Sequence, residues 1–95
     1  MVPVIQQQSD QKDFKILSNP QSKRIVLVFY STKTGQAIAS IYYEDGKLLQ
    51  QRNLAVIPGT NTWECYFAFE ASGTYIVKFG MNDIKRSGKI FKAVS

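Results

Sequence analysis

Residues 62–79 decide the fold, and they read TWECYFAF (62–69), EASG (70–73) and TYIVKF (74–79). In both outer runs bulky apolar side chains occupy every second position, namely Trp63, Cys65, Phe67, Phe69, Tyr75, Val77 and Phe79. A period of two is typical of β-strands, because successive side chains point to opposite faces of a sheet. Two such runs joined by a short glycine-containing link predict an antiparallel pair with one packed face.

The composition agrees with one globular β domain. The chain has 95 residues, which is enough for one hydrophobic core and too few for two. Hydrophobic residues make up 44% and aromatic residues 13%, and aromatic side chains favour strands. The net charge of +5 permits attraction to anionic partners, although solvated lysines alone also produce such a charge.

Several classes of chemistry are excluded by residue types. Histidine is absent, so imidazole bases, histidine-ligated metals and nucleophile–histidine pairs are impossible. The single cysteine, Cys65, rules out an intrachain disulfide and a paired-cysteine metal site, and its place between Trp63 and Phe67 predicts a small buried hydrophobe. The carboxylates do not form a pair that faces across a cleft. We therefore expect no enzyme, no catalytic residue, no cofactor and no metal.

The beginning of the chain predicts an arm or an edge strand over residues 1–13, followed by a single sandwich domain over residues 14–95. Val2, Val4 and Ile5 form an apolar tip, and the polar residues 6–12 follow as a loop or tether. The tip is expected to pair either with its own sheet or with the sheet edge of a neighbouring subunit. Residues 1–8 show no signal peptide, and no run is long enough to span a membrane.

The remaining strands are expected at residues 14–17, 24–30, 37–43, 48–52, 53–57 and 89–94. Asp45-Gly46 predicts a type I′ turn between two of them, and residues 80–83 and 85–88 carry further turn residues. The run RIVLVFY (24–30) is apolar on both sides, with Ile25, Leu27 and Phe29 opposite Val26, Val28 and Tyr30. Its second side must be covered either by loops or the arm, or by another subunit.

The segment EASGTYIV (70–77) resembles the pattern that precedes strand F in immunoglobulin-like domains. The resemblance implies a tyrosine corner at Tyr75, whose hydroxyl would bond to upstream backbone. It makes residues 62–69, 74–79 and 89–94 the strands E, F and G of that family. The resemblance therefore also implies that the chain passes from one sheet to the other between residues 62–69 and 74–79, in place of a hairpin. Val77 replaces the second cysteine of the family, as in bacterial and bacteriophage members and fibronectin type III domains that lack the disulfide. The expected fold is an all-β, antiparallel, immunoglobulin-like sandwich of seven or eight strands.

In addition to the arm and the outer side of residues 24–30, two groups of side chains are candidate binding sites. The first is a basic C-terminal hairpin that contains Lys78, Lys85, Arg86, Lys89 and Lys92, with Phe79 and Phe91 in the core. The second is a set of tyrosines, Tyr30, Tyr42, Tyr43 and Tyr66, which either form a binding platform or shield the backbone in cross-strand pairs. The partner-binding candidates are Val2, Val4, Ile5, Val26, Val28, Tyr30, Tyr42, Tyr66, Lys85, Arg86 and Lys89.

These features together favour a non-enzymatic structural or assembly module that engages other protein subunits, including copies of itself. Together with the resemblance, the signal-less start, the absent disulfide, the absent catalytic residues, the two-sided apolar strand and the arm suggest a bacteriophage virion or surface-decorating domain. We expect such a domain to be assembled in the host cytoplasm and to have no membrane partner. The alternative is a binding module for carbohydrate or for a polyanion such as nucleic acid, acting through the surface tyrosines or the basic hairpin.

Overall fold

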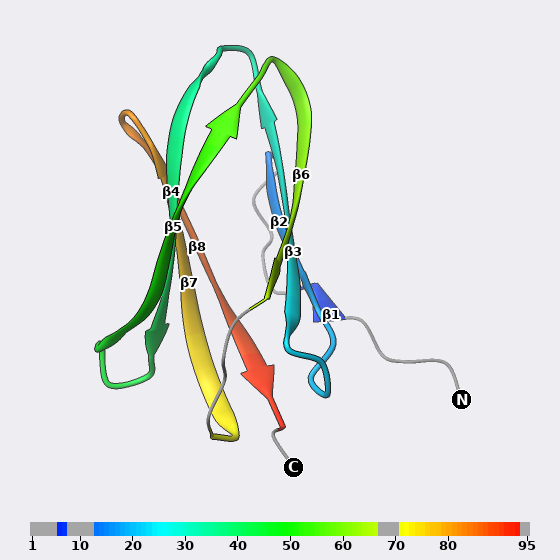
Figure 1. The fold of residues 1–95 in the computed structure, drawn as a ribbon, viewed down its shortest axis with the longest axis vertical. Helices are drawn as coiled ribbons and strands as arrows, with labels where there is room; N and C mark the ends of the chain where they lie inside the picture. Colours follow the sequence, from blue (N-terminus) through cyan, green and yellow to red (C-terminus); the bar gives the residue numbers. More distant parts are fainter. Residues whose placement is uncertain (1–5, 8–12, 67–70, 94–95) are drawn as a thin grey trace.

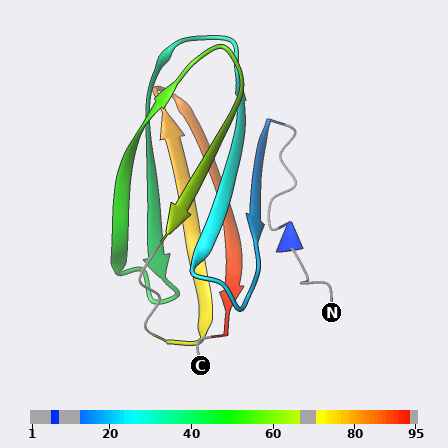
Figure 2. The same cartoon turned by 45° about the vertical axis from the view of Figure 1, so that its right-hand side comes forward.

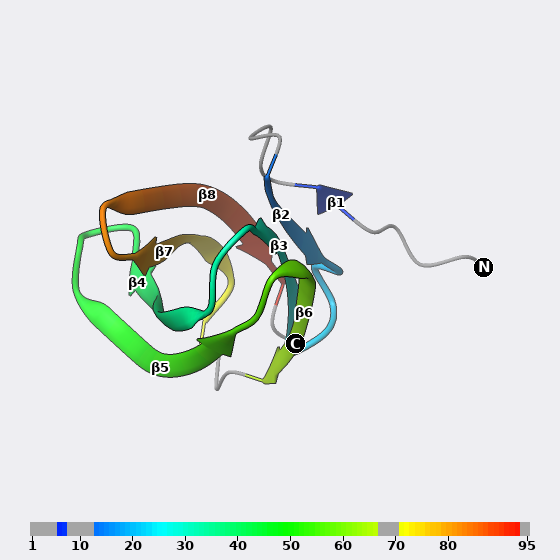
Figure 3. The same cartoon turned by 90° about the horizontal axis from the view of Figure 1, so that it is seen from above.

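The computed structural model describes residues 6–7, 13–66 and 71–93, which form two antiparallel sheets packed face to face (Figures 1 and 3). Sheet A has the order β1-β2-β3-β6 and consists of β1 (Gln6–Gln7), β2 (Phe14–Ser18), β3 (Arg24–Ser31) and β6 (Gly59–Tyr66). Sheet B has the order β5-β4-β7-β8 and consists of β4 (Gly35–Tyr43), β5 (Leu48–Val56), β7 (Gly73–Met81) and β8 (Ile84–Lys92). The prediction of an all-β antiparallel sandwich is confirmed.

The antiparallel pair predicted from the alternation of residues 62–79 is wrong, whereas the change of sheet between the two runs, which the resemblance in residues 70–77 implies, is confirmed. β6 pairs with β3 in sheet A, whereas β7 pairs with β4 and β8 in sheet B, so the two strands belong to different sheets (Figure 2). Each of the two runs has one apolar side. These two apolar sides are buried when the strands lie in opposite sheets and face each other across the core. Trp63 on β6 and Phe79 on β7 meet there, with ring centroids 5.7 Å apart.

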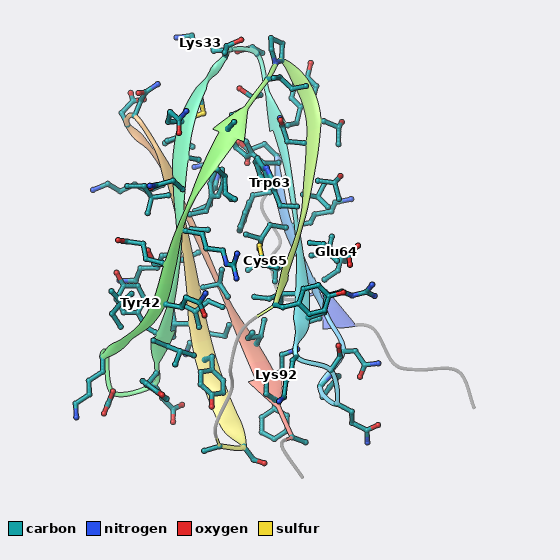
Figure 4. All side chains as sticks on the ribbon, in the orientation of Figure 1. Lys33, Tyr42, Trp63, Glu64, Cys65 and Lys92 are labelled. Carbon is teal, nitrogen blue, oxygen red and sulfur yellow. The ribbon has the colours of Figure 1, made fainter. Side chains whose placement is uncertain are left out.

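Phe79 lies at the centre of the core. Its ring centroid is 4.7 Å from that of Phe29 and 5.1 Å from that of Phe14, so one side chain of sheet B contacts three aromatic rings of sheet A, including Trp63. Cys65 is also buried between the sheets, as Figure 4 shows for Trp63 and Cys65. The predicted core positions Trp63, Cys65, Tyr75 and Phe79 are confirmed, with Trp63 only partly buried, and Phe67 lies outside the described residues.

The C-terminal strand is longer than the sequence predicted. β8 begins at Ile84, so residues 85–88 belong to the strand and not to a turn; the turn is Asn82-Asp83, where Asn82 has a φ of 55°. The pairing of Ile90 with Tyr75 directs Ile90 and Lys92 inward and Phe91 outward. Phe91 is 46% exposed, so its assignment to the core is wrong.

Three smaller predictions are also corrected. The turn after β4 is not type I′, since only Gly46 in it has a positive φ. The Tyr43 carbonyl accepts a hydrogen bond from the Gly46 N–H, and the Tyr43 N–H donates to the Lys47 carbonyl. This pattern is a three-residue hairpin loop with a glycine bulge. Residues 48–56 form one strand and not two. The only described residues of the expected arm besides Asp13 are Gln6 and Gln7, which pair with β2 as a short strand where a polar loop was expected.

The Tyr75 side chain, near the start of β7, packs against β4 and bonds to the backbone that precedes β7. The Tyr75 ring is buried, packs against Tyr43 with ring centroids 5.7 Å apart, and its hydroxyl donates a hydrogen bond to the Ala71 carbonyl. The two-sheet architecture is compatible with an immunoglobulin-like fold.

Candidate protein-binding faces

The structure divides the predicted basic hairpin into two groups of cations. Lys85 and Lys89 on β8 and Lys78 on β7 point outward and are exposed. Arg86 and Lys92 occupy inward positions of β8, on the same side as Ile90, and Arg86 pairs with the inward Phe79 of β7. The predicted placement of Lys85 and Arg86 together on a loop tip is wrong, because both lie in β8 and strand parity directs their side chains to opposite sides.

Lys92 is a structural residue. Its side chain is 1% exposed, and its ammonium donates to the carbonyl oxygens of Asn19, Ser22 and Arg24 at 2.9, 2.7 and 3.1 Å. These carbonyls belong to the β2–β3 turn of sheet A, so Lys92 ties the end of sheet B to it. Burial lowers the pKa of the Lys92 amine to about 8. Figure 4 shows the side chain between the two sheets near their lower end.

Arg86 makes a second tie between the sheets. Its guanidinium donates two parallel hydrogen bonds of 2.8 Å to the carboxylate of Asp13, directly before β2. The hydrogen bond from Arg86 lowers the pKa of the Asp13 carboxyl, against the opposing effect of burial. Both side chains are 29% exposed, so the pair is partly screened by water. Sequence reasoning missed Asp13 because the two partners lie far apart in the chain.

The outward side of sheet B is termed the lysine face and includes Ile38, Ser40, Tyr42, Ile76, Lys78, Gly80, Lys85, Ser87, Lys89 and Phe91. None of the four strands of this sheet contains Asp or Glu. The ammonium of Lys78 lies 5.0 Å from the centroid of the Tyr42 ring and covers that ring. The face therefore combines positive charge with apolar groups.

A shallow, open depression of about 470 Å³ lies on the lysine face over Gly80. Its lining includes Ile38, Ser40, Lys78, Lys85 and Ser87. The depression brings together two of the predicted basic residues, Lys78 and Lys85, with the exposed apolar side chain of Ile38.

The outward side of sheet A is termed the valine face and consists of Lys15, Leu17, Arg24, Val26, Val28, Tyr30, Thr62, Glu64 and Tyr66. Val26 and Val28 are half-buried along the central strand β3, whereas Tyr30 and Tyr66 are 55% and 60% exposed. Glu64 accepts from the Tyr66 hydroxyl at 3.0 Å and from Arg24 at 3.5 Å. The predicted outward positions of Val26, Val28, Tyr30 and Tyr66 are confirmed, and Figure 4 shows Glu64 on this side.

The other candidates contribute no site. Val2, Val4 and Ile5 lie outside the described residues. Cys65 is buried, and that burial raises the pKa of its thiol, which disfavours the thiolate form needed for nucleophilic chemistry. Within residues 6–7, 13–66 and 71–93, no three Cys, Asp or Glu side chains gather closely enough to hold a metal ion.

Comparison with models of known protein families finds no match, and comparison with curated proteins finds none either. Over the described part of the chain, no helix has the length and apolar character needed to cross a membrane.

Proposed function

We propose that this protein is a non-enzymatic structural module of immunoglobulin-like type that assembles with other protein subunits through its valine face. The immunoglobulin-like assignment draws support from the strand order. β2, β3 and β6 correspond to strands A, B and E, and β5, β4, β7 and β8 correspond to strands C′, C, F and G of that sandwich. The hydrogen bond from Tyr75 to the Ala71 carbonyl supports a tyrosine corner.

The observation that carries the assembly proposal is the apolar strip on the valine face. Val26 and Val28 lie on a central strand with Leu17 beside them, and the exposed Tyr30 continues the strip. Tyrosine and aliphatic side chains on a flat sheet are typical of the centre of a protein interface. A neighbouring copy of this chain is the occupant we propose, because Lys15, Arg24 and Glu64 leave this face with little net charge, whereas two lysine faces repel each other.

The setting is part of the same proposal. We place the assembly in a bacteriophage virion, where a small sandwich without enzymatic residues decorates or joins repeated subunits. This setting is supported by the resemblance in residues 70–77, and the neighbouring genes test it, since capsid, tail or portal genes are expected beside this one.

Sedimentation equilibrium over a range of concentrations up to about 1 mM tests the assembly, since a dissociation constant of that order still marks a weak specific contact. We expect self-association that Val28→Thr and Tyr30→Thr weaken. Ile57→Thr is the matched control, because Ile57 is also exposed but lies outside the strands of the valine face. A monomer at every concentration overturns the proposal, and so does association that Tyr30→Thr leaves unchanged.

The alternative of a carbohydrate- or nucleic-acid-binding module has less support. Of the tyrosines it invokes, Tyr42 has its ring covered by Lys78, and Tyr66 lies on the opposite sheet. The two rings therefore do not form one platform. Retention on heparin or on a glycan array that these tyrosines control would favour the alternative.

A further inference from the structure

The lysine face contains a glycine that the fold itself does not require. Gly46 has a φ of 95°, which favours glycine, and a Cβ on Gly35 would lie 2.6 Å from Cε of Met81. Gly80 has no positive φ, and a Cβ there would meet only the Ile84 carbonyl oxygen at 3.8 Å, an ordinary contact. Glycine inside a strand is unfavourable by about 0.5–1 kcal/mol and often marks a position that a ligand approaches closely.

The missing side chain of Gly80 leaves the depression on the lysine face. Gly80 lies in one cross-strand row with Ile38 on β4 and Lys85 on β8. Ile38 is 46% exposed and provides an apolar wall. A hollow of about 470 Å³ that opens to solvent is large enough for one apolar side chain of a partner.

Two cations border this hollow, one across the strands and one along β7. Lys85 is the direct pairing partner of Gly80, and Lys78 lies two residues along β7, about 7 Å away at ~3.4 Å per residue. Neither lysine forms an ion pair among the described residues, and the nearest acid along the chain is Asp83 in the adjacent turn. The charge of this surface is therefore not neutralised within the strands.

We propose that the lysine face binds an extended acidic segment of another protein, with one apolar side chain in the hollow over Gly80. Side chains at positions i and i±2 of an extended chain point to the same side about 7 Å apart. For a segment that runs along β7, a carboxylate two positions from the apolar residue therefore lies over Lys78. The long side chain of Lys85, about 5 Å across the strands from Gly80, extends to a carboxylate on the other side of the apolar residue. The pattern is acid–x–apolar–x–acid, and this site is independent of the valine face.

The position of the aromatic side chains favours a protein segment over nucleic acid. Stacking of bases requires exposed rings beside the cations. Phe91 pairs with Thr74, six residues from Gly80 along β7 and thus about 20 Å from the hollow. The Tyr42 ring is covered by Lys78. A second copy of this chain is disfavoured as the occupant, because its net charge is +5.

A titration of the ¹⁵N-labelled protein, followed by amide chemical shifts, tests the proposal. The probe is a capped peptide Asp-Glu-Thr-Leu-Thr-Glu-Asp, and its matched control has Ser in place of Leu. We expect shifts centred on the amides around Gly80 in β7 and β8, and binding about tenfold weaker for the Ser peptide, because the buried leucine side chain is lost. No shift at millimolar peptide, or equal binding of both peptides, overturns the proposal.

Variants of the protein provide the second arm. Gly80→Val fills the hollow without changing charge, so we expect the Leu peptide to bind no better than the Ser peptide, while stability stays equal or increases. Lys85→Gln is expected to weaken binding about threefold, and Lys33→Gln, an exposed loop lysine seen at the top of Figure 4, not at all. Binding of the Leu peptide that Gly80→Val leaves intact overturns the proposal. Tighter binding of a ten-nucleotide oligothymidylate than of the peptide overturns it in favour of nucleic acid.

Discussion

Both sides of β8 carry lysine or arginine residues, but the surroundings of these cations differ between the two sides. On the inward side, Arg86 and Lys92 bond to sheet A through a carboxylate and three carbonyl oxygens. On the outward side, Lys85 and Lys89 face solvent without ion pairs among the described residues. A basic run in a strand is therefore two separate sets of charges. The inward set stabilises the fold, while the outward set is available to a partner.

The inward set can be buried because its charges are compensated. A lysine removed from water is strongly unfavourable unless its ammonium group is hydrogen-bonded, and Lys92 finds three acceptors in one turn of sheet A. The backbone of the next residue adds a fourth hydrogen bond to this region, since the Ala93 N–H donates to the Pro20 carbonyl at 2.8 Å. The polar contacts on this side therefore hold the β2–β3 turn against the end of β8.

The largest effect is expected from Lys92→Met, which keeps an apolar stem and removes the ammonium. The three carbonyls of the β2–β3 turn lose their donor, at about 1 kcal/mol each, so the free energy of unfolding should fall by about 3 kcal/mol. Urea denaturation measures this loss. The control is Lys89→Met, the same substitution on the outward side of β8. Equal losses of unfolding free energy in the two variants would contradict the structural role assigned to Lys92.

The pH dependence of the same residue gives a second prediction. Burial lowers the pKa of Lys92 from 10.5 to about 8, so between these values the unfolded chain binds more protons than the folded one. The stability contributed by this residue therefore increases as the pH rises through that window. The difference in unfolding free energy between wild type and Lys92→Met should grow from pH 8 to pH 10. A difference that shrinks over this range would contradict the burial of the amine.

A smaller effect is expected from Asp13→Asn, which removes the carboxylate from Arg86. The partly exposed, bidentate pair should contribute about 1 kcal/mol. Because the pKa of Asp13 is lowered in the fold, this contribution is present at neutral pH and is lost as the pH falls through the folded pKa. Urea denaturation at pH 7 and pH 2.5 checks both statements, with Asp83→Asn in the exposed turn as the control.

The smallest effect is expected from Lys89→Gln. Its side chain is exposed, so the unfolding free energy should change by no more than about 0.5 kcal/mol. Lys89 pairs with Ile76, four residues from Gly80 and about 13 Å away, which exceeds the screening length of about 8 Å at physiological salt. The peptide titration should therefore respond less to Lys89→Gln than to Lys85→Gln. A larger response would move the binding site toward Phe91.

The sequence was sufficient for the class of fold because alternation is a local property. Trp63, Cys65, Tyr75 and Phe79 were assigned to the core from their period of two, and the structure confirms them. Pairing is not local: β6 and β7 follow each other closely in the chain, yet they lie in two different sheets. The apolar side of each run is the same in both arrangements, so alternation alone does not distinguish them.

The candidate surfaces were predicted less well, again for a physical reason. Residues 85–88 have the composition of a turn, in which parity has no meaning, so Lys85, Arg86 and Lys92 form one basic group in the sequence. Once β8 is known to start at Ile84, counting back from the buried Ile90 places Arg86 and Lys92 inward and Phe91 outward. The role of Gly80 needed the three-dimensional structure, since only the space around its Cα separates it from Gly35.

The most direct test of this division of β8 is one peptide titration carried out on the wild type, Lys85→Gln and Lys92→Met, with the urea midpoint of each protein measured alongside. The account predicts a double dissociation: Lys85→Gln loses peptide affinity at an unchanged midpoint, and folded Lys92→Met keeps its affinity at a lower midpoint. Loss of affinity in both variants, or an unchanged midpoint for Lys92→Met, would contradict the assignment of the inward cations to the fold and the outward cations to a partner.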